Sequence, residues 1–203
     1  GLFSDICDFW VQESEKFRKD NTWGYKVMRN GGYSYNKHPH PIMKSQTNAG
    51  PCFLCKKNDF EKIRFQEERW LDDMPYALGE DQTMFYKMFL SGLNVLTSYD
   101  SGIKHLDAGT TIKNAEKEKV LAFCDCRFKL IFWKRFLFDN VTRANKVVNL
   151  ICFVYTMIIN LLISLIKGNT TIFKQKYYGY KSGFHFLTTS SFASDLGRRP
   201  GEV

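Results

Sequence analysis

The sequence predicts a mixed α/β part followed by an α-helical, membrane-associated part. Strand-like and helix-like patterns alternate in the first half, whereas the second half holds one long apolar run, residues 147–166. Charge divides in the same way: residues 1–111 carry 14 Lys and Arg against 15 Asp and Glu, and residues 112–203 carry 15 against 6. These observations predict two parts, 1–111 and 112–203.

The composition allows a sizeable folded core. The 203 residues suffice for one large or two small domains, and 44% of them are hydrophobic. This composition excludes a disordered or collagen-like chain. Because the chain begins with Gly1 and no charged segment followed by an apolar one opens it, we expect no signal peptide and a fragment of a longer protein.

The first elements follow from local patterns. The beginning of the chain has the apolar spacing of a helix, and the Gly- and Tyr-rich stretch 23–35 predicts a β-hairpin. Residues 48–55 predict a turn at Gly50 that leads into a buried strand. A short helix or turn opens at Asp59.

An amphipathic helix is predicted over residues 82–92, because its large apolar side chains fall on one helical face. Gly92 suits its C-terminal end, and a strand is expected at residues 93–96. Glu80 and Asp81 precede this helix, where the helix dipole favours negative charge.

Acidic residues cluster in the same region, with six carboxylates between residues 67 and 81. Such a cluster lies either on a solvated face or in a site that needs a raised carboxylate pKa or a cation. The order of Glu80, Asp81 and His105 favours a site. Taken singly, the ordinary explanations are helix capping for Glu80 and Asp81 and a hydrogen-bonded loop histidine for His105.

The second part carries the membrane signal. The uncharged run 147–166 is long enough, as a helix, to span a bilayer core of ~30 Å. Basic residues flank it on both sides, which leaves its orientation open. Segment 127–138 interleaves cations with aromatics, a composition suited to a membrane interface over anionic headgroups. Inside the run, polar residues form one narrow stripe at helical spacing: Asn149, Thr156, Asn160 and Ser164.

That stripe has three possible uses, namely packing on protein, lying at the headgroup boundary, or meeting another helix. A buried core helix with basic ends is the ordinary alternative to a membrane helix. We favour membrane association, because a soluble core helix seldom needs twenty uncharged positions.

Two other classes of protein are disfavoured. The basic charge follows the apolar run, and no zinc-finger, RNP-type or helix-turn-helix pattern accompanies it, so we expect no nucleic-acid partner. The pairs Cys52/Cys55 and Cys124/Cys126 lie far apart in the chain and lack turn residues between their members. We therefore expect reduced thiols rather than a zinc site.

Four motifs occur in a particular order between residues 45 and 111. A glycine turn before a predicted strand is followed by Phe65-x-Glu-Glu-Arg-Trp, by Tyr76-Ala-Leu-Gly-Glu-Asp-Gln, and by Ile103-x-His-Leu-Asp-Ala-Gly. This order resembles the acceptor-side half of family 2 glycosyltransferases of GT-A fold. The likeness extends loosely through Phe132-Trp-Lys-Arg-Phe and the apolar run. It implies that residues 1–111 form part of a Rossmann-like GT-A domain.

The resemblance also implies roles for four residues. Asp81 would deprotonate the acceptor hydroxyl, and Glu80 would support or orient it. Gly50 matches the glycine loop beside the donor sugar, and His105 matches a histidine that helps to hold a divalent metal, Mg²⁺ or Mn²⁺, on the nucleotide diphosphate. The implied reaction is a single displacement at the anomeric carbon of a nucleotide-sugar, with inversion.

One motif of the family does not occur. The chain has no Asp-x-Asp, which in the family supplies the main metal and donor contacts from the nucleotide-binding half. We therefore expect that half, and the metal, upstream of these motifs, and we expect the chain alone to be inactive.

The expected acceptor is a lipid-linked or cell-surface polysaccharide, at the cytoplasmic face of the cell membrane. A second possibility is a noncatalytic, membrane-anchored interaction domain whose acidic cluster is only a solvated helix end.

Overall fold

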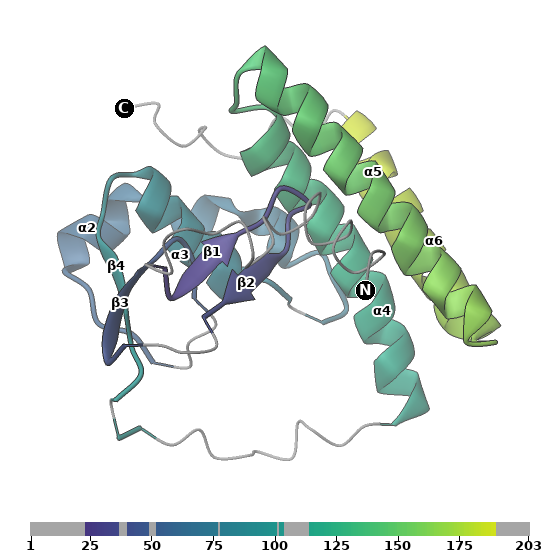
Figure 1. Ribbon diagram of the computed structural model, residues 1–203, viewed down its shortest axis with the longest axis horizontal. Helices are drawn as coiled ribbons and strands as arrows, with labels where there is room; N and C mark the ends of the chain where they lie inside the picture. Colours follow the sequence, from purple (N-terminus) through teal and green to yellow (C-terminus); the bar gives the residue numbers. More distant parts are fainter. Residues whose placement is uncertain are drawn as a thin grey trace.

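The computed structural model describes residues 23–36, 40–48, 52–76, 78–100, 102–103 and 114–189. Short strands and helices make one side of the molecule, and three long helices make the other (Figure 1). The predicted mixed α/β class, with long helices in the second half, is confirmed. The predicted N-terminal helix, Gly50 and His105 lie outside the described residues.

The strands form two antiparallel pairs. β1 (Tyr25–Val27) pairs with β2 (Tyr33–Tyr35), which confirms the predicted hairpin, and β3 (Ile42–Ser45) pairs with β4 (Val95–Ser98). A parallel bridge between Trp23 and Lys44 links the two pairs, and the Gln46 amide donates to the Tyr25 carbonyl at 2.8 Å. These short strands do not themselves make up a Rossmann-like sheet, so that assignment stays a prediction.

Short helical elements connect β3 to β4. They are α2 (Lys57–Lys62), the 3₁₀ turns η1 (Phe65–Glu67) and η2 (Arg69–Leu71), and α3 (Glu80–Leu90). The predicted helix at 82–92 corresponds to α3, which ends at Leu90 with Ser91 as its C-cap, and Gly92 then takes a left-handed φ of +80°.

The buried strand predicted for residues 51–55 is wrong. Residues 52–56 have no regular structure, and their side chains are exposed, Leu54 almost completely. Only Phe53 makes aromatic contacts, with Phe60 and Phe85. An apolar run predicts a strand only where a partner strand is available, and β4 pairs with β3 instead.

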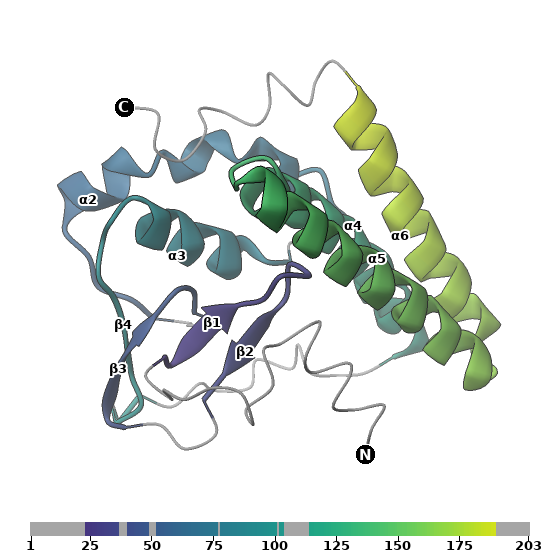
Figure 2. The same ribbon diagram turned by 45° about the horizontal axis from the view of Figure 1, so that its top comes forward.

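Three long helices complete the fold. α4 (Ala115–Phe132) continues into the π-helical turn η3 (Trp133–Phe138), and α5 (Arg143–Ile166) and α6 (Thr170–Thr188) follow. The Asn114 side chain accepts a hydrogen bond from the Lys117 amide at 2.7 Å, and Asn169 caps α6 in the same way. The three helices lie side by side (Figure 2).

α4 and α6 approach each other closely at two glycines of α6. A Cβ at Gly179 would overlap the backbone oxygen of Phe123, and a Cβ at Gly183 would lie 2.9 Å from Leu130 Cδ2. Small residues four positions apart therefore let the two backbones meet.

The main hydrophobic core extends across residue 111. Trp70 stacks on Phe128, with ring centroids 5.8 Å apart, and Tyr86 of α3 contacts Phe132 and Phe136. The two predicted parts thus share one core within the described residues.

Segment 127–138 forms part of this core, so its predicted place at a membrane interface is wrong. Leu130, Ile131 and Phe132 are fully buried. Its two arginines are buried as well: Arg127 donates to the carbonyl of Trp70 at 3.3 Å, and Arg135 donates to the Glu68 carboxylate at 2.7 Å. A mixture of aromatics and cations suits either environment, and here acceptors far away in the chain satisfy the two arginines.

Candidate functional site

Asp81 lies in the first turn of α3, immediately after a tight turn at Gly79. Gly79 has a left-handed φ of +81°, and its face packs against the Phe128 ring, which leaves no room for a side chain. The Thr83 amide donates to the Gly79 carbonyl at 2.9 Å, which closes the first turn of the helix. This turn fixes the backbone positions of Glu80 and Asp81 at the start of α3.

Gln82, the next residue, ties the start of α3 to both strand pairs. Its side-chain Nε2 donates to the carbonyl of Gly31, in the β1–β2 turn, at 2.9 Å. Its own carbonyl accepts from Thr47 Oγ1, beyond β3, at 3.1 Å. Gln82 and Thr47 are both buried, so their hydrogen bonds hold the start of α3, with Glu80 and Asp81, in a fixed position.

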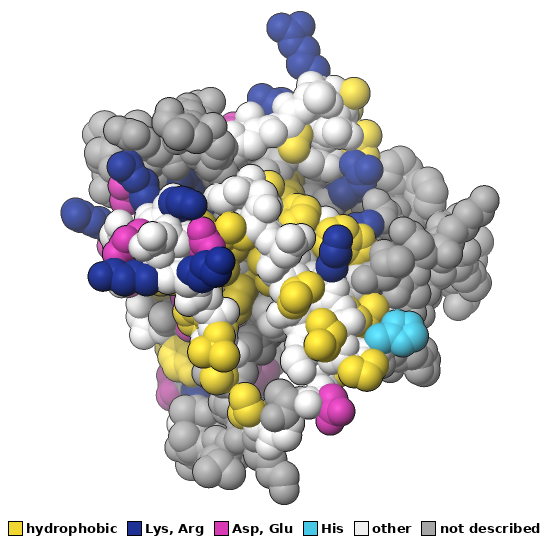
Figure 3. Space-filling view, turned by 90° about the vertical axis from the view of Figure 1, so that its left-hand side faces the viewer, with side chains coloured by type: hydrophobic (Ala, Val, Ile, Leu, Met, Phe, Trp, Pro, Cys, Tyr) yellow, Lys and Arg dark blue, Asp and Glu magenta, His cyan; other side chains and the backbone are white. Residues whose placement is uncertain are grey.

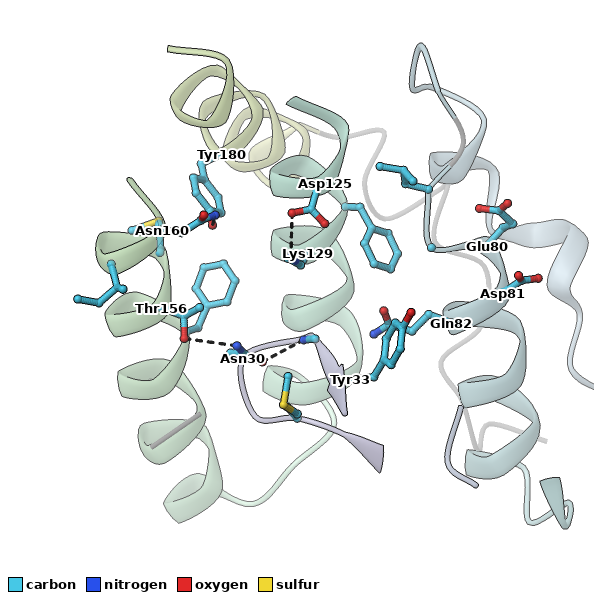
Figure 4. Close-up of a pocket in the computed structure, with 18 of the residues that line it drawn as sticks. Asn30, Tyr33, Glu80, Asp81, Gln82, Asp125, Lys129, Thr156, Asn160 and Tyr180 are labelled. Atoms are coloured by element: carbon cyan, nitrogen blue, oxygen red, sulfur yellow. Dashed lines mark hydrogen bonds and ion pairs between the residues drawn. The ribbon is translucent and has the colours of Figure 1, made fainter. Parts of the chain in front are cut away.

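A cavity of about 810 Å³ lies beside this turn, between the start of α3, the β1–β2 turn and the long helices. In Figure 4, Glu80 and Asp81 stand at one side of it, while Thr156, Asn160 and Tyr180 stand at the other. The lining is mixed. Amides and rings both contribute, notably Asn30, Asn48, Gln82, Tyr33, Tyr76 and Phe128.

The cavity wall formed by α4 and α5 carries two polar contacts. Lys129 and Asp125 form an ion pair at 2.8 Å, one helical turn apart on α4. Asn30 Nδ2 donates to Thr156 Oγ1 at 3.4 Å and so connects the β1–β2 turn to α5 (Figure 4).

Asp81 has the electrostatics of a base. Its half-buried position raises the pKa of the Asp81 carboxyl above its ordinary value, chiefly through loss of solvation and secondly through repulsion by Glu80. Glu80 is exposed. A carboxylate with a raised pKa holds a transferred proton better than an ordinary one, as a general base requires.

The remaining acids do not join Asp81 at the cavity. Glu67 pairs with Arg64 at 3.2 Å, and Asp72 and Asp73 are exposed, with Asp73 3.9 Å from Arg127. Among the described residues, no group of three or more His, Cys, Asp or Glu side chains could hold a metal ion. The predicted metal ligand His105 and donor-side Gly50 are outside those residues, although Asn48, near Gly50 in the chain, lines the cavity.

Glu68 has a role that its acidic neighbours do not share. Its fully buried carboxylate accepts from Lys87 at 2.6 Å, from Arg135 at 2.7 Å and from the Trp70 indole at 2.7 Å. Burial lowers the pKa of Lys87, and the Glu68 charge opposes that shift. Local sequence gave no signal for this network, because Lys87 and Arg135 lie 19 and 67 positions away.

No protein-family model matches the chain, and no curated protein or solved structure is significantly similar to it.

Proposed function

We propose that this chain is the acceptor-side part of an inverting glycosyltransferase, and more particularly one of the family 2 type with a GT-A domain. It would transfer a sugar from a nucleotide-sugar to a lipid-linked or cell-surface polysaccharide acceptor. The observation that carries the proposal is Asp81: a half-buried carboxylate with a raised pKa, held by a rigid turn at the edge of a cavity.

The proposed chemistry at Asp81 is general-base catalysis. Asp81 accepts the proton of the acceptor hydroxyl while that oxygen forms a bond to the anomeric carbon of the donor. The bond from this carbon to the diphosphate breaks at the same time, and the diphosphate leaves with the electron pair. Burial raises the pKa of Asp81, and repulsion by Glu80 adds to this shift.

The described residues do not fit a divalent metal, because they contain no suitable group of ligands. We therefore place the metal, which would neutralise the diphosphate, with the nucleotide-binding half.

The cavity supports a sugar acceptor by its size and its lining. Its volume of about 810 Å³ falls within the usual range for ligand sites, ~300–1,000 Å³. The amides of Asn30 and Asn48 can hydrogen-bond hydroxyl groups, and the Tyr33 ring offers an apolar surface for the face of a sugar.

One exposed apolar face of the β3–β4 pair is suited to pack against a further part of the protein. Ile42 and Leu96 point away from the core, with 65% and 57% of their surfaces exposed. Hydrophobic side chains gather on the side of the molecule that carries α2, β3 and β4 (Figure 3). A two-stranded sheet is only marginally stable by itself. The exposed apolar face of this pair therefore suits contact with the proposed nucleotide-binding half.

Membrane association is supported by α5. Among the described helices, α5 alone is long and apolar enough to cross a membrane. We propose that the chain acts at the cytoplasmic face of the cell membrane, where a lipid-linked acceptor is concentrated.

The test uses the longest natural polypeptide that contains this chain, assayed with a panel of nucleotide-sugars. Asp81→Asn keeps the shape of the side chain but cannot accept the proton, so we expect turnover to fall by about 10²–10⁴-fold. Asp59→Asn is the matched control, because Asp59 also lies in the first turn of a helix, α2, away from the cavity. Asp59→Asn should retain normal turnover.

Normal turnover in Asp81→Asn would contradict the proposal. If no nucleotide-sugar in the panel is consumed by the unaltered polypeptide, the noncatalytic interaction domain is the better description.

A further inference from the structure

α5 is an amphipathic helix whose polar side faces the protein. The inner stripe of α5 consists of the four polar residues of the apolar run, Asn149, Thr156, Asn160 and Ser164, and the first and last of these are buried. The opposite side, the outer row, is entirely apolar and 37–58% exposed: Val147, Leu150, Val154, Ile158, Leu162 and Leu165. α5 therefore exposes to solvent the apolar side that a soluble protein would bury.

The inner stripe is hydrogen-bonded along its length. Near the start of α5, Asn149 donates to the Leu137 carbonyl at 2.6 Å and accepts from Arg29 at 3.2 Å. Three turns later, Asn160 accepts from Lys176 at 2.6 Å and donates to the Tyr180 hydroxyl at 3.2 Å. Of the three uses that the sequence left open for this stripe, packing on protein is the one observed.

These contacts make a bilayer-spanning position of α5 costly. If α5 stood upright in the membrane, Arg29 and Lys176 would be carried into the hydrocarbon with it, because they bond to its inner stripe. The Asp125–Lys129 ion pair of α4 faces the same cavity as α5 and would follow (Figure 4). Charged groups at that depth are costly, whereas an α5 lying flat leaves all of them on the protein side.

The charge around α5 identifies the kind of surface that the outer row fits. Residues 140–189 contain six Lys and Arg and no Asp or Glu. Arg143 lies at the start of α5, Lys167 directly follows its end, and Lys174 is exposed on α6. An apolar row with cations at both ends complements a bilayer that carries anionic headgroups.

We propose that α5 lies in the plane of a membrane, with its outer row in the boundary between headgroups and acyl chains and its terminal cations on lipid phosphates. The helix then attaches the chain to one leaflet without crossing it. This inference goes beyond the transfer reaction, since it holds whether or not Asp81 is a base.

The first experiment measures binding of the full chain to phosphatidylcholine vesicles with and without phosphatidylglycerol. We expect binding that needs the anionic lipid and weakens with salt. Ile158→Glu should weaken it by roughly tenfold or more, because it places a charge in the middle of the outer row. Leu96→Glu, at an exposed position of β4, is the matched control and should bind normally. Circular dichroism checks that each variant is folded.

The second experiment measures depth, using vesicles whose lipids carry bromine at defined acyl positions. Val147→Trp, Ile158→Trp and Leu165→Trp place a fluorophore at the start, middle and end of the outer row, read as differences from the wild-type chain. For a helix in the membrane plane, all three should be quenched most by the same shallow bromines.

Deep quenching at position 158 with shallow quenching at the other two would show a spanning helix and overturn the proposal. Absence of vesicle binding would also overturn it. So would equal binding to vesicles with and without phosphatidylglycerol, or a dimer in vesicle-free solution that Ile158→Glu dissociates while vesicles go unbound.

Discussion

At the scale of single residues, two carboxylates of one acidic cluster have opposite environments. Glu68 is fully buried among Lys87, Arg135 and Trp70, whereas Asp81 is half-buried and has no cation bonded to it among the contacts described above. Glu68 accepts hydrogen bonds from all three of these partners, whereas partial burial raises the pKa of Asp81. Position in the fold, rather than membership of the cluster, decides which carboxylate is suited to proton transfer.

The pH dependence of the proposed transfer reaction would test the coupling between Glu80 and Asp81. A protonated Asp81 cannot accept a proton, so kcat/KM should fall as pH falls through its pKa, which lies above the ordinary value. Glu80→Gln removes the negative charge that helps to raise this pKa, so the acid limb of the profile should move to lower pH. The movement should be small, because burial is the larger cause and remains.

The pH–rate profile of the Glu80→Gln polypeptide, recorded beside that of the unaltered one, measures this movement. An acid limb that moves to higher pH would contradict the assignment of Asp81 as the base, whereas a lower maximum rate at an unchanged pKa would point to a role in positioning.

At the scale of elements, the pairing of α4 with α6 depends on two glycines in different surroundings. At Gly179 the obstacle to a side chain is the backbone oxygen of Phe123, whereas at Gly183 it is the flexible end of the Leu130 side chain. Backbone cannot yield without moving a helix, but a leucine can rotate.

Gly179→Ala should therefore lower the free energy of unfolding, by about 1–3 kcal/mol, despite the better helix propensity of alanine. Gly183→Ala is the matched comparison. It should lower the free energy of unfolding by clearly less, because the Leu130 side chain can move aside. Denaturant unfolding of both variants measures the difference. Equal losses would show that the helices do not meet as closely at position 179 as described.

Prediction of elements succeeded where the pattern was local. The hairpin at 23–35, helix α3 and helix α5 follow from turn residues and apolar spacing, and each is present. Segments 51–55 and 127–138 were assigned wrongly, because an apolar or aromatic run does not reveal which part of the chain will cover it. The contact between α4 and α6 was missed for the same reason.

The candidate site was predicted only in part. Glu80 and Asp81 were proposed from their order in the sequence, and in the structure both line a cavity; their catalytic roles stay predictions. The opposite wall, with Asn30, Thr156 and Asn160, could not be found, since these residues come from a hairpin turn and from a helix far along the chain. Residues that converge only through tertiary packing leave no spacing to recognise.

At the scale of the whole molecule, Glu68 connects the two predicted parts. Its carboxylate binds Lys87 on α3 and Arg135 on η3, which lie on opposite sides of residue 111 in the chain. Removal of one partner from such a network leaves the others buried and charged, which is far more costly than loss of a surface pair.

Glu68→Gln should accordingly lower the free energy of unfolding by about 3–5 kcal/mol, because the buried Lys87 and Arg135 would lose their counter-charge. Glu67→Gln is the control. Its pair with Arg64 is partly exposed, and its loss should cost no more than about 1 kcal/mol. Thermal unfolding followed by far-UV circular dichroism and by tryptophan fluorescence measures both. Two separate transitions would show that the parts do not unfold together.

The hydrogen bonds of the inner stripe of α5 have a consequence for how permanent the attachment is. The polar partners of Asn149 and Asn160 described above belong to the protein, so detachment from lipid would leave these hydrogen bonds intact and need no refolding. An in-plane α5 would therefore let the intact, folded molecule exchange between vesicles. A helix threaded through the bilayer could not do so, because transfer would require its withdrawal and reinsertion.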